Sequence, residues 1–154
     1  MKGQFMYQTI MKQLAVQLPK QKYDHIKDRQ FHLGIFIEPG LTDIIAGRRT
    51  IEARFSKNKS APYQKINPLD VVIMKKTGGN VVGYFTVKDV KYLNIGEISM
   101  PDIKAAYNSQ LCIADELWEM KKDSKYASLI YIEDVNVLKK FAVPKKGMQT
   151  WIVL

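Results

Sequence analysis

The chain has 154 residues, a hydrophobic content of 46% and one cysteine, Cys112, which excludes an internal disulfide. Its length suits a single domain with a sizeable core, and no apolar run is long enough to span a bilayer. Lys and Arg number 24 against 15 Asp and Glu, and the resulting net charge of +9 favours polyanionic partners such as RNA or DNA.

The inventory of metal-binding side chains is small. Cys112, His25 and His32 provide only three Cys or His residues, fewer than a zinc site of this type usually takes. We therefore expect no metal and no cofactor, although counting alone leaves a carboxylate-held Mg²⁺ site open. The single cysteine fits a reducing compartment and no cleavable signal is apparent, so we expect a cytoplasmic protein that does not enter a membrane.

Residues 1–31 are predicted to form a helical extension. Apolar side chains recur there at helical spacing: Tyr7, Ile10, Met11, Leu14 and Leu18. Pro19 ends or kinks this helix, and a second helical segment is expected over residues 20–29. We expect the apolar stripe to pack on the domain that follows, residues 32–154.

That domain is predicted to begin with a strand over residues 32–37 and a turn at Glu38-Pro39-Gly40. A short helix follows, with its inward-facing residues at helical spacing: Leu41, Ile44 and Ile45. Gly47 suits the left-handed conformation that closes such a helix. A second strand is expected directly after this glycine.

The functional hypothesis depends on residues 47–54, Gly-Arg-Arg-Thr-Ile-Glu-Ala-Arg. Alternation places Glu52 and Arg54 on one face of a strand, about 7 Å apart. The apolar residues share the other face: Ile51, Ala53 and Phe55. A carboxylate flanked by guanidinium groups holds those groups in place for an anionic ligand, and the alternative is a structural ion pair. Strict alternation puts Arg49 on the apolar face, but we expect the turn to direct it toward the cleft.

Residues 56–68 are predicted to form a loop in which lysines are interleaved with an aromatic ring. Lys57 and Lys59 are candidates for contacts with phosphate groups, and Tyr63 offers a ring on which an unpaired base can stack. The alternative for each of these residues is a place in a solvated, mobile loop.

The middle of the chain carries the clearest strand pattern. Residues 71–76 and 81–90 are β-branched and flank Gly78-Gly79, which predicts a hairpin. We expect residues 87–92 to continue as a bent strand that closes the sheet. Ser99 is the expected N-cap of the helix that follows.

A further helix is predicted over residues 113–122, then a strand over 126–138 and a last strand over 150–154. Trp118 is expected in the core, with the wall of a base pocket as the alternative. Lysines cluster between the last two strands: Lys139, Lys140, Lys145 and Lys146. They form a candidate rim for phosphate contacts or protect a strand end against aggregation.

The stretch from Gly47 to Arg54 resembles the signature of the ASCH (activating signal cointegrator homology) family, Gly-x-Lys-x-x-Glu-x-Arg. Gly47, Glu52 and Arg54 match it, and Arg49 stands where the family usually has lysine. The resemblance extends from about His32 to the end of the chain. It implies an α+β fold: a small PUA-like mixed β-barrel with flanking helices, preceded here by the N-terminal helical extension, and with a cleft at the signature.

The resemblance and the charge together predict a nucleic-acid-binding module, with RNA as the first candidate and a nucleotide as a smaller one. Arg49, Glu52 and Arg54 would form the cleft. The loop residues and the lysine cluster would contact the polynucleotide: Lys57, Lys59, Tyr63, Lys145 and Lys146.

The alternative is a hydrolase, either a ribonuclease or an amidohydrolase acting on a modified nucleoside, because a few members of the family are enzymes. One branch uses a lysine and a nucleophilic threonine, but Arg49 and Glu52 occupy those positions here, and Thr50 is two residues out of register. Glu52 remains a candidate base for a ribonuclease. We expect binding rather than catalysis.

Overall fold

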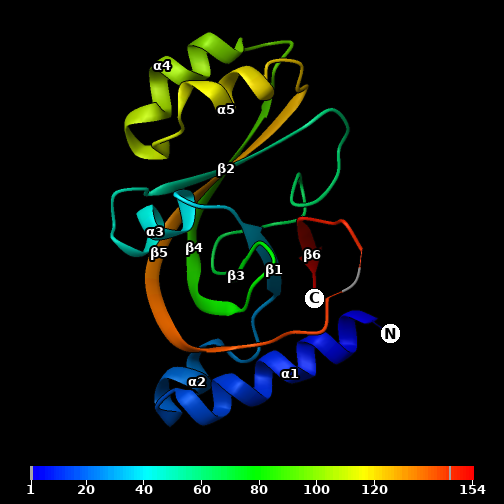
Figure 1. The fold of residues 1–154 in the computed structure, drawn as a ribbon, viewed down its shortest axis with the longest axis vertical. Helices are drawn as coiled ribbons and strands as arrows, with labels where there is room; N and C mark the ends of the chain where they lie inside the picture. The colour runs from blue at the N-terminus through cyan, green and yellow to red at the C-terminus, as the bar shows by residue number, and fades with distance from the viewer. Residues whose placement is uncertain (1, 146) are drawn as a thin grey trace.

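The structure, a computed structural model, describes residues 2–145 and 147–154. In this part of the chain, five helices surround one mixed sheet, an α+β arrangement (Figure 1). The helices are α1 (Lys2–Gln17), α2 (Lys20–Ile26), α3 (Gly40–Ile45), α4 (Met100–Leu111) and α5 (Asp115–Met120). The strands are β1 (Phe31–Phe36), β2 (Ile51–Ser56), β3 (Val71–Lys76), β4 (Val81–Asn94), β5 (Tyr126–Phe141) and β6 (Trp151–Val153).

The sheet has the strand order β2-β5-β4-β3-β1-β6, in which only the β1–β3 pair is parallel. The two long strands, β4 and β5, curve through the middle and curl the sheet into a half-barrel (Figure 1). Their pairing shifts register at three places, after Val81, Tyr84 and Val87, and such irregularities bend a sheet. Strands β2 and β6 are the two edges of this sheet, and Arg54 of β2 spans the open seam between them by a hydrogen bond to the carbonyl oxygen of Thr150, directly before β6.

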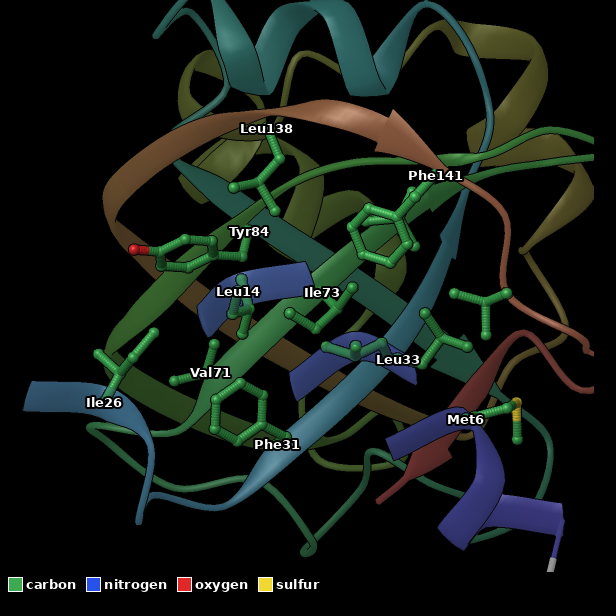
Figure 2. Close-up of a cluster of buried hydrophobic side chains, with 13 residues drawn as sticks. Met6, Leu14, Ile26, Phe31, Leu33, Val71, Ile73, Tyr84, Leu138 and Phe141 are labelled. Atoms are coloured by element: carbon green, nitrogen blue, oxygen red, sulfur yellow. The ribbon is translucent and has the colours of Figure 1, made fainter. Parts of the chain in front are cut away.

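The N-terminal helices cover one end of the half-barrel, opposite the end that carries α4 and α5 (Figure 1). Met6, Ile10 and Leu14 of α1 are buried in one cluster with residues of four strands, among them Phe31 and Ile73 (Figure 2). The predicted apolar stripe thus packs on the sheet as expected. None of the described helices is long and apolar enough to cross a membrane.

The strand predicted over residues 71–76 is confirmed without change as β3, and the two segments predicted between 81 and 92 form the single strand β4. Helix ends are where the expectations were less accurate. The second helix ends at Ile26 rather than at 29, and α5 is shorter than the predicted 113–122. The Ser99 hydroxyl caps α4, as predicted, by accepting a hydrogen bond from the Asp102 amide at 3.2 Å.

Gly47 has a φ of +80°, in the left-handed region that glycine tolerates best. It separates α3 from the extended residues that lead into β2. The prediction for this glycine is confirmed, and the turn has a consequence for the site. Because β2 begins only at Ile51, Arg49 precedes the strand and is not bound by its alternation.

Candidate functional site

A cavity of about 300 Å³ opens beside the edge strand β2, a size typical of ligand sites in proteins. Its wall is built from β2, from residues 35–40 at the end of β1 and the start of α3, and from residues 112–121 around α5. The three charged residues predicted to form a cleft, Arg49, Glu52 and Arg54, all line it.

Glu52 lies between the two arginines. Its Oε1 is 3.5 Å from Nη2 of Arg49, and its Oε2 is 3.8 Å from Nη2 of Arg54. Only 3% of Glu52 is exposed, yet no residue in the described part of the chain donates a hydrogen bond to its carboxylate. Both separations are too long for hydrogen bonds, so the acceptor oxygens retain their capacity for a ligand or water.

Arg54 is held rigidly across the open seam of the sheet. Its guanidinium donates hydrogen bonds to the carbonyl oxygens of Ile35 at 2.9 Å and Thr150 at 3.3 Å. It also lies over the rings of Phe36 and Trp151, with centroid distances of 4.7 and 4.9 Å. Burial lowers the pKa of Arg54, and the nearby Glu52 carboxylate opposes that shift. Arginine stays charged in proteins, so the group is a fixed cation with N–H donors to spare.

Arg49 is held less tightly than Arg54. Its Nε is buried, and no described residue accepts a hydrogen bond from it. The guanidinium lies directly against Gly40, where an added Cβ would come within 2.2 Å of Nη1. The absence of a side chain at Gly40 therefore creates the space that Arg49 occupies.

A buried hydrogen-bond chain fixes Trp151, whose ring lies under Arg54. The Trp151 indole donates to Nδ1 of His32 at 3.0 Å, and Nε2 of His32 lies 2.8 Å from Asp70 Oδ2. Because Nδ1 accepts, the neutral imidazole carries its proton on Nε2 and donates it to Asp70. Burial lowers the pKa of His32, which favours this neutral form.

The other predicted site residues lie outside this cavity. Lys57 and Lys59 are exposed in the loop after β2, and Lys145 donates a hydrogen bond to the Gly147 carbonyl oxygen. Lys146 lies outside the described residues. Tyr63 is only 8% exposed, and its ring packs against Tyr92 and Tyr126. The prediction that Tyr63 offers a free stacking face is therefore wrong, because its ring is buried in this aromatic cluster.

Several cavity residues were missed by the sequence analysis because nothing local marks them. Phe36 and Lys121 come from segments distant in sequence that meet only in the fold, and Cys112 lies at the end of α4. Trp118, expected in the core, belongs both to a core cluster and to the cavity wall, and its indole Nε1 has no hydrogen-bond partner among the described residues. Thr50, the alternative nucleophile, does not line the cavity.

No group of three or more His, Cys, Asp or Glu side chains in residues 2–145 and 147–154 is arranged to hold a metal ion. Two carboxylates line the cavity: Glu52, between the arginines, and Glu38, which accepts hydrogen bonds from the amide and hydroxyl groups of Thr42. The arrangement is therefore suited to hydrogen bonding with a polar, partly anionic ligand.

Comparisons with models of protein families and with curated proteins found no match. Among solved structures, the ASCH protein of Zymomonas mobilis superposes with a TM-score of 0.63 at 12% identity, over 82% of this chain and 89% of that chain. Two point mutants of the same protein superpose with TM-scores of 0.62, at 11% and 12% identity, covering 82% of this chain and 91% and 89% of theirs. The chain therefore has the fold of this ASCH protein, a mixed sheet curled into a half-barrel with flanking helices.

Proposed function

We propose that this protein binds single-stranded RNA by taking one unpaired base into the cavity beside β2. The observation that carries the proposal is the buried Glu52 carboxylate, flanked by Arg49 and Arg54 and free of hydrogen bonds from described residues. A buried acceptor beside two cationic donors matches a base edge that carries an amino group next to a carbonyl oxygen.

The walls of the cavity also suit a base. Most of its lining is apolar, and Trp118 contributes an aromatic ring. RNA is read mainly through unpaired bases that are splayed out and held by stacking and hydrogen bonds. The net charge of +9 provides the long-range attraction for a polyanion.

The test measures the binding of a labelled single-stranded RNA at low salt by fluorescence anisotropy. Glu52→Gln replaces one acceptor oxygen by a donor that faces two cations, so we expect affinity to fall roughly tenfold or more. Glu97→Gln, the same change at an exposed residue outside the cavity, is the matched control and should leave the affinity unaltered. Absence of any RNA affinity in the unaltered protein would refute the proposal.

Gly40→Ala provides a second probe. The new Cβ has to displace the Arg49 guanidinium, while the helix that begins at Gly40 gains a better helix former. We therefore expect weaker RNA binding without a loss of thermal stability. This combination separates a role in binding from a role in folding.

A hydrolase is the second candidate, and one observation favours it. The Glu52 carboxylate borders an accessible cavity and lies next to two cations that can stabilise a developing negative charge. The amidohydrolase version lacks its nucleophile because Thr50 lies outside the cavity. A ribonuclease is tested by incubating labelled RNA with the protein and excess Mg²⁺ for hours, since intact RNA would exclude it.

A further inference from the structure

A second, smaller hollow of about 70 Å³ lies next to the cavity, and the two share Arg54, Phe55 and Thr150 in their walls. The remaining lining comes from β5 and the loop after β2: Ser56, Ser60, Ala61, Pro62 and Ser128. Its volume is several times the roughly 10–15 Å³ that one water molecule needs. We call it the serine hollow.

Ser128 is the feature of the serine hollow that needs an explanation. Only 1% of this residue is exposed, and its hydroxyl group has no hydrogen-bond partner among the described residues. Leaving a buried hydroxyl unpaired is costly, and such groups usually have a partner that is a water molecule or a ligand. Ser128 is one of the residues that line the serine hollow, so space for such a partner lies beside it.

Ser128 is also the direct cross-strand partner of Arg54 in the β2–β5 pair. Directly opposed residues project to the same face of a sheet, about 5 Å apart at Cβ. The Arg54 guanidinium uses two N–H groups on backbone carbonyl oxygens and keeps others free. A hydroxyl and a fixed guanidinium beside one small space form a donor pair that matches an anionic oxygen.

The charge around the serine hollow points the same way. Arg54 is the one charged residue among those that line it, and the exposed Lys57 and Lys59 lie in the loop between Ser56 and Ser60. The two lysines therefore belong to the loop that contributes Ser60 to the hollow. Their position gives a cationic approach to a site that already holds a buried cation.

We propose that the serine hollow binds one phosphate group, held by Ser128 and Arg54. This inference rests on the proposed function in one respect: in RNA, the phosphate would be the one adjacent to the nucleotide whose base occupies the larger cavity. Arg54 would then contact both parts of the same nucleotide, because it lines both spaces.

The direct test uses inorganic phosphate at constant ionic strength, monitored by amide chemical shifts in ¹H–¹⁵N NMR spectra. We expect phosphate to shift the amides of β2 and β5 around Arg54 and Ser128. Ser128→Ala removes a hydroxyl that has no partner among the described residues, so it should fold normally and lose these shifts. Ser109→Ala, at an exposed serine outside both spaces, should retain them. If phosphate causes no shifts, or the same shifts in Ser128→Ala, the hollow holds water and the inference is wrong.

The RNA measurements separate this inference from the proposed function. We expect Ser128→Ala to weaken binding of a short oligoribonucleotide roughly tenfold, as for loss of one charge-assisted hydrogen bond, and to leave binding of a nucleoside without phosphate unchanged. If Glu52→Gln abolishes RNA binding and Ser128→Ala does not affect it, the proposed RNA-binding function is supported and the phosphate site is refuted. If phosphate binding depends on Ser128 but no RNA binds, the serine hollow binds free phosphate and the proposed RNA-binding function is refuted.

Discussion

Tyr84 places a hydroxyl group at the edge of the apolar cluster beneath α1, where no described residue offers it a hydrogen bond (Figure 2). The residue is 1% exposed. An unpaired buried hydroxyl destabilises the folded state, so Tyr84→Phe should raise the free energy of unfolding by roughly 1 kcal/mol. Urea unfolding at neutral pH measures this, and a loss of stability would mean that the hydroxyl has a water partner.

The same residue predicts a weakness at high pH. Burial, reinforced by Asp134, raises the pKa of Tyr84 to about 12. The unfolded chain releases this proton near pH 10 and the folded chain does not, so stability is complete below pH 10 and falls as pH rises from there toward 12. In Tyr84→Phe, unfolding followed between pH 9 and 11 should show a smaller decline than in the unaltered protein.

His32 gives the opposite pH dependence. Burial lowers its pKa below the ordinary value of 6.5, so the unfolded chain takes up a proton at a higher pH than the folded chain. The contribution of His32 to stability is therefore complete above pH 6.5 and is lost as the pH falls from there through the lower pKa of the folded state. His32→Gln should be less stable overall but should lose this slope between pH 7 and 5. A slope that is unchanged in the variant would assign it to other groups.

The signature residues show what a sequence can predict at this scale. Alternation placed Glu52 and Arg54 together correctly, because strand geometry is local. The contacts of Arg54 with Ile35 and Thr150 across the seam were not predictable, since they join residues distant in the chain. Replacing Arg54 by alanine would remove them as well as any ligand contact, so Glu52→Gln and Gly40→Ala are cleaner tests of binding.

Strand β6 is short but carries much of the support for the site. Its Trp151 is buried against Phe36, donates a hydrogen bond to His32 and lies under Arg54. Deleting residues 150–154 removes these contacts and exposes the edge of β1. We expect the truncated chain to lack a cooperative thermal transition by circular dichroism. A soluble truncated chain that melts cooperatively would show that the half-barrel does not need β6.

Element prediction succeeded where the pattern was both local and strong. The β-branched strand β3 and the Ser99 cap of α4 were predicted from a few adjacent residues. A bend over residues 87–92 was expected, but the register shifts after Val81 and Tyr84 were not readable in the same way, because they depend on how two distant strands pair. The burial of Tyr63 depends likewise on Tyr92 and Tyr126, which approach it only in the folded chain.

At the scale of the whole molecule, the net charge of +9 can act on RNA in two ways, by attraction at a distance and by direct contacts with phosphates at the site. The dependence of RNA affinity on salt concentration distinguishes these two contributions. For a single strand, each neutralised phosphate contributes about −0.7 to the slope of log affinity against log salt concentration. Lysines that only attract RNA at a distance change the slope little, whereas lysines that contact phosphates change it by this amount each.

Lys57 and Lys59 are exposed in the loop that contributes Ser60 to the serine hollow, so we expect the double variant Lys57→Ala, Lys59→Ala to reduce the magnitude of this slope by about 1.4. Lys12→Ala, Lys20→Ala removes the same charge from exposed positions of α1 and α2, which cover the end of the half-barrel opposite α4 and α5 (Figure 1), and should leave the slope nearly unchanged. Equal slopes in the two double variants would mean that RNA is held by the overall field of the protein. In that case the loop after β2 would have no special part in binding.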